Sequence, residues 1–129
     1  MLTSELSILA IYGIIVAITL LLQATGALLQ LDMGYLLSSR DEGRTVTGMA
    51  ARTERALSNS VTAMALFAPA ILILAVKDAF SAQTLLASQV FLAARVIYLP
   101  AYVFGIVGIR SFVWTIGFFA TIALYFMAL

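Results

Sequence analysis

The sequence contains no cysteine and no histidine. Without cysteine the chain can form no disulfide, no thiolate metal site and no cysteine nucleophile. Without histidine it lacks the usual general base and the commonest metal ligand. Any chemistry must therefore use arginine, tyrosine, hydroxyl or amide groups, or the reactive group of a cofactor, and we expect no metal.

Charge is also scarce. Only 10% of the 129 residues are charged and 64% are hydrophobic, a balance that does not describe a soluble domain. The formal net charge is +1 and no basic tract is present, so nothing points to a nucleic-acid partner. Strand-like alternation of apolar and polar residues is absent, which argues against a membrane β-barrel.

What the sequence does have is long apolar runs. Four of them are long enough to cross a hydrocarbon core, which takes about 20 helical residues. They cover residues 8–31, 56–76, 85–109 and 112–129. We predict an all-α, integral membrane four-helix bundle, with residues 1–129 as a single domain. The start, MLTSELS, has no positive residue before its apolar run, so we expect no cleaved signal peptide.

The stretch 91–111, FLAARVIYLPAYVFGIVGIRS, reads as most of a membrane-spanning helix that nevertheless carries polar groups. Arg95, Tyr98 and Tyr102 recur at i, i+3 and i+7, so all three share one helical face. A charge at membrane depth costs several kcal/mol. Arg95 therefore needs a partner, a watery cavity or a ligand.

A second polar face lies on the preceding helix. Arg52, Arg55, Asn59 and Thr62 span only about 80° around a helix axis. Arginines at an interface often reach lipid phosphates, and that reading is an open alternative. Asn59 and Thr62 lie deeper on the same stripe and favour a polar groove.

These two helices are predicted to form an antiparallel hairpin. Lys77 and Asp78 make a very short turn, and Ser81 is the expected N-cap of the third helix. Thr45 or Thr47 is the expected N-cap of the second helix. Counting outward from the turn by equal rise per residue gives three level pairs. They are Asn59 with Arg95, Arg55 with Tyr98, and Arg52 with Tyr102. Two such faces would line one slot.

A tight turn is expected after the third span, at Gly105, Gly108 and Arg110, with Ser111 as the N-cap of the fourth helix. Backbone N–H groups at a helix start, beside a guanidinium, make an anion site. The fourth helix itself is predicted to be a lipid-facing wall, with Trp114 near its start as an interfacial anchor.

The first span carries a polar stripe that is expected to form interhelical hydrogen bonds. The stripe comprises Tyr12, Thr19, Gln23 and Gln30. Orientation follows from the positive-inside rule. One side of the membrane receives only Lys77, and the other receives Arg40, Arg44, Arg52, Arg55 and Arg110. We expect the first and third loops, and the opening of the polar groove, to be cytoplasmic.

Four segments together resemble the membrane-associated proteins in eicosanoid and glutathione metabolism, in their bacterial branch. They are LLQA (21–24), RTERALSN (52–59), RVIYLPAY (95–102) and IRS (109–111). The resemblance covers essentially the whole chain. It implies a homotrimer in the bacterial inner membrane, where the orientation expected from the positive-inside rule makes both termini periplasmic. It also implies glutathione bound between neighbouring subunits at the cytoplasmic side.

The resemblance also implies roles for individual residues. Arg55 and Asn59 match residues that grip the polar ends of glutathione, with Arg52 and Thr62 on the same face. The remaining matches are Arg95, Tyr98 and Tyr102, which line that site, Arg110, which stabilises the thiolate, and Ser111 beside it. A cation near a thiol lowers its pKa and supplies a nucleophile at neutral pH. The reactive sulfur would belong to glutathione, so a chain without cysteine could still perform thiol chemistry.

Three features depart from the family pattern. Thr62 stands where the family has a glutamate that binds the amino end of the tripeptide. Residues 32–37, DMGYLL, lack the basic residues that follow the first helix in the leukotriene-forming enzyme. The spacing from Tyr102 to Arg110 differs among family members, so the thiolate arginine could correspond to a position one turn away.

Three functions are candidates for this sequence, and the third ranks last. The first is a glutathione-dependent transferase or peroxidase that acts on a lipophilic electrophile from the bilayer. The second is a non-catalytic relative that binds a lipid or small anion, or that scaffolds another membrane protein. The third, a proton-coupled exporter, needs a carboxylate at membrane depth. The carboxylates nearest the spans sit at or beyond their ends, at Glu5, Asp32, Glu54 and Asp78.

Overall fold

The computed structural model describes residues 2–129, and within this range the chain forms helices and no strand. Four helices are long and apolar enough to cross a membrane, and a further one is a single turn in the first loop. In chain order they are α1 (Glu5–Gln30), α2 (Met33–Leu36), α3 (Gly48–Val76), α4 (Ala82–Val103) and α5 (Val107–Ala128). The prediction of an all-helical, four-span, multi-pass membrane protein is confirmed.

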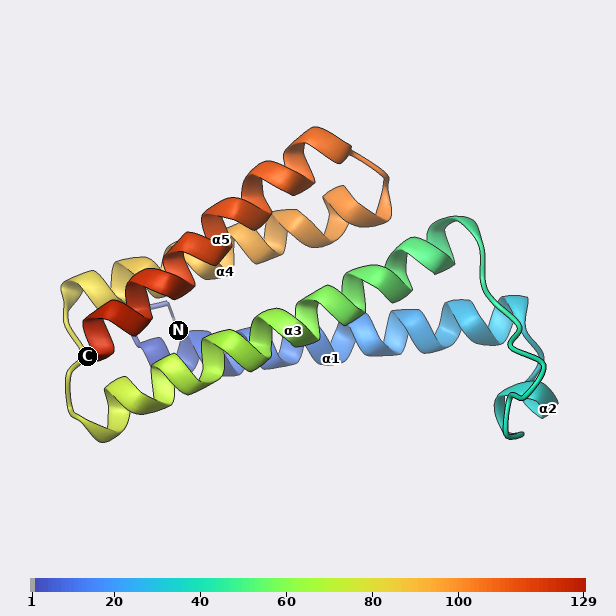
Figure 1. The fold of residues 1–129 in the computed structure, drawn as a ribbon, viewed down its shortest axis with the longest axis horizontal. Helices are drawn as coiled ribbons and strands as arrows, with labels where there is room; N and C mark the ends of the chain where they lie inside the picture. The colour runs from blue at the N-terminus through green and yellow to red at the C-terminus, as the bar shows by residue number, and fades with distance from the viewer. Residues whose placement is uncertain (1) are drawn as a thin grey trace.

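The four long helices form two antiparallel pairs, α1 with α3 and α4 with α5 (Figure 1). The pairs lie against each other at the end that carries the α3–α4 turn and both ends of the chain. Toward the α4–α5 turn, the α4–α5 hairpin diverges from α3, while α2 and the first loop extend beyond the ends of α1 and α3. We call these two regions the closed end and the open end of the bundle.

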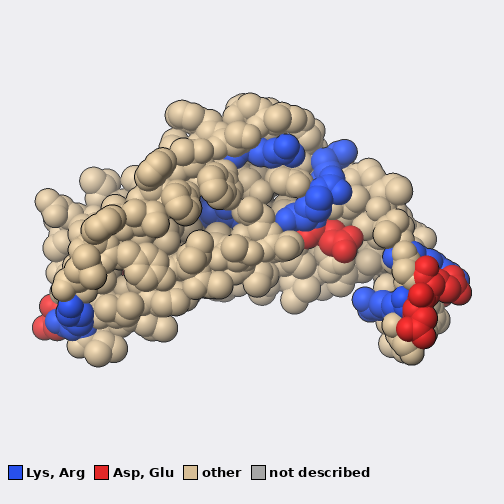
Figure 2. All heavy atoms as spheres, in the orientation of Figure 1, with Lys and Arg blue, Asp and Glu red and all other residues tan. Residues whose placement is uncertain are grey.

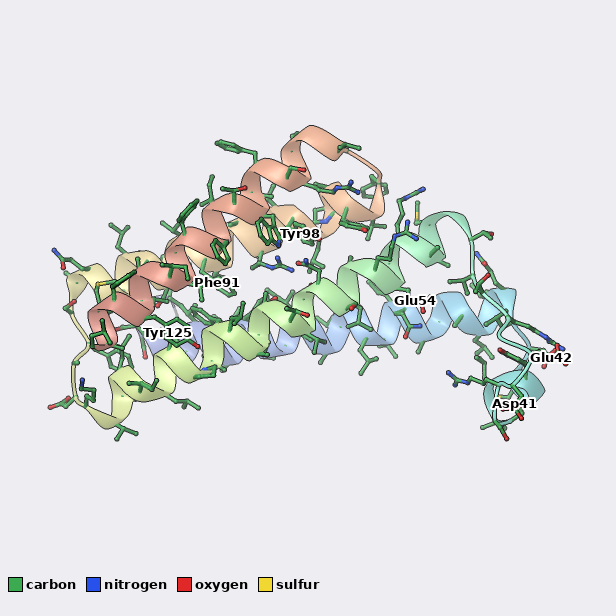
Figure 3. The ribbon with its side chains drawn as sticks, in the orientation of Figure 1. Asp41, Glu42, Glu54, Phe91, Tyr98 and Tyr125 are labelled. Carbon is green, nitrogen blue, oxygen red and sulfur yellow. The ribbon has the colours of Figure 1, made fainter. Side chains whose placement is uncertain are left out.

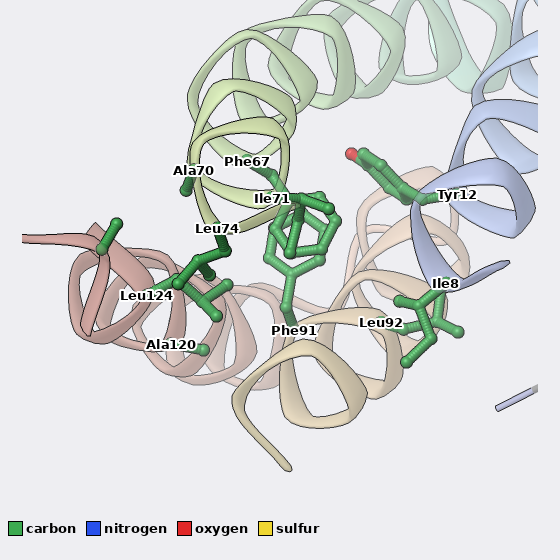
Figure 4. Close-up of a cluster of buried hydrophobic side chains, with 11 residues drawn as sticks. Ile8, Tyr12, Phe67, Ala70, Ile71, Leu74, Phe91, Leu92, Ala120 and Leu124 are labelled. Atoms are coloured by element: carbon green, nitrogen blue, oxygen red, sulfur yellow. The ribbon is translucent and has the colours of Figure 1, made fainter. Parts of the chain in front are cut away.

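The closed end holds the main apolar core, to which all four long helices contribute (Figure 4). The rings of Phe67 and Phe91 stack with centroids 3.9 Å apart, and Tyr12 meets Phe91 edge-on at 5.0 Å. The hydroxyl of Tyr12 donates to the carbonyl oxygen of Ser60 at 2.9 Å. This bond confirms an interhelical role for the stripe at Tyr12, whereas Thr19 donates to Ile15 of its own helix.

The starts of α3 and α4 are fixed by polar side chains. Ser81 caps α4 as predicted, and it forms a capping box in which its side chain accepts from the backbone N–H of Thr84 while Thr84 accepts from that of Ser81. Thr47 occupies the N-cap position of α3 without a side-chain bond. Its backbone instead pairs with the amide of Gln30, which accepts at 2.8 Å and donates at 3.0 Å. Gln30 therefore joins the end of α1 to the start of α3.

The prediction that Ser111 caps the last helix is wrong. Helix α5 begins at Val107 with Ile106 in the cap position, so Ser111 lies inside the helix. Gly105, at φ +76°, closes the turn within a few residues, because a left-handed conformation reverses the chain at little cost in glycine. The N–H of Ile106 bonds back to Ala101 at 2.8 Å, and the new helix starts at once.

Large apolar side chains cover the outer surface of the bundle, as expected for a protein surrounded by lipid. Exposed examples on α1 and α5 are Leu21, Leu29, Phe112, Phe119 and Phe126. The lipid bilayer is thus the environment in which the polar groups described next must be stabilised.

Candidate functional site

Arg95 is the most deeply buried charged side chain of the site, with 2% of its surface exposed. Its two terminal nitrogens donate to Oδ1 of Asn59 at 2.9 Å and to Oγ of Ser60 at 3.1 Å. Its guanidinium also stacks over the ring of Tyr98, 4.1 Å from the centroid. Its Nε has no hydrogen-bond partner within residues 2–129. Arg95 is therefore held by neutral groups alone.

Tyr102 contacts the arginines that α3 and α5 contribute to the site. Its hydroxyl accepts from Nε of Arg55 at 3.2 Å, and the guanidinium of Arg110 lies over its ring, 4.7 Å from the centroid. The rings of Tyr98 and Tyr102 are 5.6 Å apart. Helices α3, α4 and α5 thus each place an arginine on this tyrosine pair.

The predicted pairing between α3 and α4 is correct at Asn59, which accepts from Arg95. It is shifted for the residues closer to the open end. Arg55 reaches Tyr102 rather than Tyr98, and Arg52 donates to the carbonyl oxygen of Val103 at 2.7 Å rather than to Tyr102. The reason is geometric. Side chains lean toward the N-terminus of their helix, which for α3 is the open end, so its arginines reach residues farther from the turn.

Two small cavities lie beside these side chains. One, of about 210 Å³, is lined by Tyr98, Arg110, Ser111, Trp114 and Thr115. The other, of about 90 Å³, lies between α3, α4 and α5, and its polar lining includes Asn59, Thr62 and Arg95. Trp114 lines both, so they adjoin at this ring.

Helix α5 contributes to the site, and the prediction of a plain lipid-facing wall is wrong. Trp114, Gly117, Phe118 and Thr121 all line the smaller cavity. Their spacing of i, i+3, i+4 and i+7 defines one helical face, a signal that the sequence offered. At Gly117 the absence of a side chain lets α5 approach Arg95, whose Cδ is 3.8 Å from the position a Cβ would occupy. The sequence also gave no sign that Ser60 belongs to the site. Ser60 and Asn59 are adjacent in the chain and point in different directions around the helix, so a shared helical face could not reveal that both accept from Arg95.

No carboxylate within residues 2–129 forms a salt bridge with the arginines of the site. Within residues 2–129 the salt bridges are those of Arg44 with Asp32 and Glu42, both in the first loop. A hydrogen bond from the Tyr35 N–H, with Arg44, lowers the pKa of Asp32, and Arg44 lowers the pKa of Glu42. Figure 2 shows basic side chains gathered where the α4–α5 hairpin diverges from α3, with one acidic group beside them. Figure 3 places Glu54 near this end of α3 and Glu42 in the first loop, away from Tyr98.

Comparison with known proteins identifies the family. The family model described as the MAPEG family matches residues 7–129. The chain belongs to the MAPEG family. No curated protein and no solved structure matches it.

The departures from the MAPEG pattern have visible consequences. Thr62 turns its hydroxyl back to the carbonyl of Ser58 at 3.1 Å, so this position offers no charge to a ligand. The segment after α1 folds as α2, where Tyr35 stacks under Arg44 at 4.5 Å. Residues 2–129 contain no group of three or more carboxylates that could hold a metal. The ligand roles of the site residues stay predictions.

Proposed function

We propose that the protein is a glutathione-dependent transferase or peroxidase that acts on lipophilic electrophiles from the bilayer. The observation that carries this proposal is the convergence of Arg55, Arg95 and Arg110 on the Tyr98–Tyr102 pair, with no carboxylate partner among the described residues. A charged side chain at the centre of a bilayer costs about 2.5–3.5 kcal/mol. An anionic guest would offset that cost.

Glutathione fits the charge of this set. Its two carboxylates match the arginines, which offer paired donors in a planar fork. Arg55 and Asn59 hold its polar ends, and Arg95, Tyr98 and Tyr102 form the wall. Arg95 Nε, a buried donor without a partner, is available to a ligand oxygen or to a water beside it. The amino end of the tripeptide has no carboxylate to meet, because Thr62 stands at that position.

Arg110 is the residue that prepares the chemistry. Glutathione would supply a thiol, which attacks the electrophile as thiolate and forms a sulfur–carbon bond while the leaving group departs with its electron pair. The guanidinium of Arg110 lowers the pKa of a thiol held beside it, so the nucleophile is present at neutral pH. Stacking on Tyr102 keeps this guanidinium in place, and Ser111 offers a hydroxyl in the same cavity.

One subunit does not enclose enough space for the tripeptide. The two cavities measure about 90 and 210 Å³, whereas small-molecule sites measure roughly 300–1,000 Å³. A neighbouring subunit would complete the site, in agreement with a homotrimer. The exposed rings of Trp114 and Phe118 give a lipophilic small molecule a path from the bilayer. The arginine-rich open end would face the cytoplasm of a bacterial inner membrane, with both termini periplasmic.

A second candidate function rests on Thr62 and on the hydrogen bonds that Arg95 makes within its own subunit. Both terminal nitrogens of Arg95 already have partners in the same subunit, and Thr62 bonds its own helix. A chain with these features would bind a small anion or a lipid, or scaffold another membrane protein, without turnover.

The proposal is tested by titrating glutathione into the purified protein in detergent and measuring binding by calorimetry. Binding should be saturable, and it should weaken at least tenfold in Arg95→Ala and Arg110→Ala. Arg40→Ala is the matched control, since it removes one positive charge from an exposed loop residue whose side chain donates to the carbonyl of Leu36. Because the chain has no cysteine, the ultraviolet absorbance of thiolate reports only the ligand. Absence of binding at millimolar glutathione would overturn the proposal.

Turnover separates the two candidates. A chlorodinitrobenzene is a suitable lipophilic electrophile, and conjugate formation should fall with Arg110→Ala more than with Ser111→Ala. Saturable binding without conjugate or peroxide reduction would favour the non-catalytic function.

A further inference from the structure

A large apolar groove lies between α1, α3 and α4 at the open end of the bundle. Its volume is about 650 Å³, more than three times that of either cavity beside the tyrosines. This size lies within the roughly 300–1,000 Å³ of small-molecule sites. The groove shares no lining residue with either cavity, so it is a separate feature of the molecule.

The shape of the groove matches one lipid leaflet. Along α1 it extends from Ile15 to Gln30, about 22 Å of helix at about 1.5 Å rise per residue. Half of a hydrocarbon core is about 15 Å thick, so the groove covers the depth at which the acyl chains of one leaflet lie. The groove starts at the open end, where α1 and α4 finish, and runs toward the middle of the bundle.

The lining offers almost no polar group to a ligand. Its three threonines, Thr19, Thr25 and Thr53, each donate to a carbonyl of their own helix. The rest of the lining is mainly hydrocarbon, with Leu22 and Leu99 on facing helices. A peptide or a sugar would leave its own polar groups without partners here, whereas an acyl chain has none to satisfy.

A cation lies at the rim. Arg52 stands on α3 between the lining residues Met49 and Thr53, and its Nε donates to the carbonyl of the lining residue Val103 at 2.7 Å. Its two terminal nitrogens have no hydrogen-bond or salt-bridge partner within residues 2–129. The guanidinium is therefore held at the edge of an apolar groove, at the open end of the bundle, with both terminal nitrogens available to a ligand.

We infer that the groove binds one acyl chain of an anionic phospholipid whose phosphate is held by Arg52. A phosphate accepts two parallel hydrogen bonds from a guanidinium, and the ion pair engages a cation that forms no salt bridge within residues 2–129. The surrounding bilayer supplies this ligand at high concentration. The inference stands independently of the proposed thiol chemistry, and it assigns Arg52 to a lipid site instead of the glutathione site.

Native mass spectrometry of the purified protein tests this inference, with phosphatidylglycerol and phosphatidylcholine of identical acyl chains as probes. One phosphatidylglycerol per subunit should survive detergent washing, in preference to phosphatidylcholine. Val103→Trp should abolish retention because the ring fills the groove. Val96→Trp is the matched control, since Val96 is an exposed valine of α4 outside the lining.

The charge is tested separately. Arg52→Gln should lower phosphatidylglycerol affinity about fivefold, the factor that one cation contributes near an anionic lipid surface, while Arg52→Lys should keep most of it. Arg40→Gln makes the same change in net charge in the exposed loop and should have no effect. If Val103→Trp fails to fold, Thr25→Trp fills the groove from an exposed position on α1.

A diazirine-labelled phosphatidylglycerol locates the site. Adducts within residues 15–30 and 99–104 support the inference. Adducts confined to α5, equal retention of phosphatidylcholine, or retention unchanged by the tryptophan variants would each overturn it. Because the chain has no other cysteine, a Val103→Cys variant carries a single reactive thiol in the groove. If this thiol cross-linked to a second copy and no lipid adduct formed, another subunit would fill the groove and the inference would also be overturned.

Discussion

The closed end and the open end of the bundle differ in which side chains fill the space between the helices. At the closed end, Phe67, Phe91 and Tyr12 fill the space between the helices, and the hydroxyl of Tyr12 is satisfied by a backbone carbonyl. At the open end, arginines and tyrosines occupy the equivalent positions, and the cavities lie beside them. The comparison indicates that stability is concentrated at one end, while the other is left polar and incompletely filled for a ligand.

The largest effect should come from breaking the closed end. Phe91→Ala removes a fully buried ring that stacks on Phe67, and large-to-small substitutions of this kind cost about 3–5 kcal/mol. Thermal or denaturant unfolding in detergent measures the loss. Phe119→Ala, an exposed phenylalanine on α5, is the control and should change the free energy of unfolding by less than about 0.5 kcal/mol. Equal effects would mean that the core is not at this end.

Arg95→Leu sharpens the contrast from the other side. It removes two hydrogen bonds but also removes a buried charge, so the free energy of unfolding should fall less than in Phe91→Ala. Glutathione affinity should fall at least tenfold, a loss of about 1.4 kcal/mol or more. Calorimetry and unfolding on the same preparation separate the two effects. A protein that unfolds like Phe91→Ala would show that Arg95 is part of the core rather than of a ligand site.

Ser81 and Ser111 give a comparison with a smaller expected effect. Ser81→Ala removes a working N-cap and its capping box, which costs about 1 kcal/mol. Ser111→Ala lies inside α5 and removes no cap, so unfolding should change by only a few tenths of a kcal/mol. If the Ser111 variant were the less stable of the two, α5 would begin at Ser111 and not at Val107.

The smallest effect is a pH dependence of the first loop. The bonds from Tyr35 and Arg44 lower the folded-state pKa of Asp32, and Arg44 lowers that of Glu42. Their contribution to loop order is therefore complete above the unfolded values, about 3.9 and 4.3, and is lost as the pH falls through the lower folded values. Proteolysis of residues 38–47 by an acid protease should accelerate in this range. Arg44→Gln should weaken the dependence, because it removes the effect on Glu42 but leaves the Tyr35 bond to Asp32, and a transition near neutral pH would contradict the prediction.

The helical positions were readable from the sequence, but the partners across helices were not. The four spans, the Ser81 cap and the shared face of Arg95, Tyr98 and Tyr102 follow from local hydropathy, capping and periodicity. The predicted Asn59–Arg95 pair was also correct, because it lies where the α4–α5 hairpin is still close to α3. Farther out, Arg52 and Arg55 missed their predicted partners, since the lean of their side chains toward the helix N-terminus shifts their reach toward the open end.

The sequence by itself determined that this chain crosses the membrane four times and carries arginine and tyrosine on matching faces, because each feature depends on residues within a few turns of one helix. The tertiary structure decided that Ser60 is a second partner of Arg95, that Trp114 brings α5 into the site, and that Arg52 turns to the rim of the apolar groove. These depend on how far the hairpin diverges from α3, which is set by packing among four helices and by no segment alone.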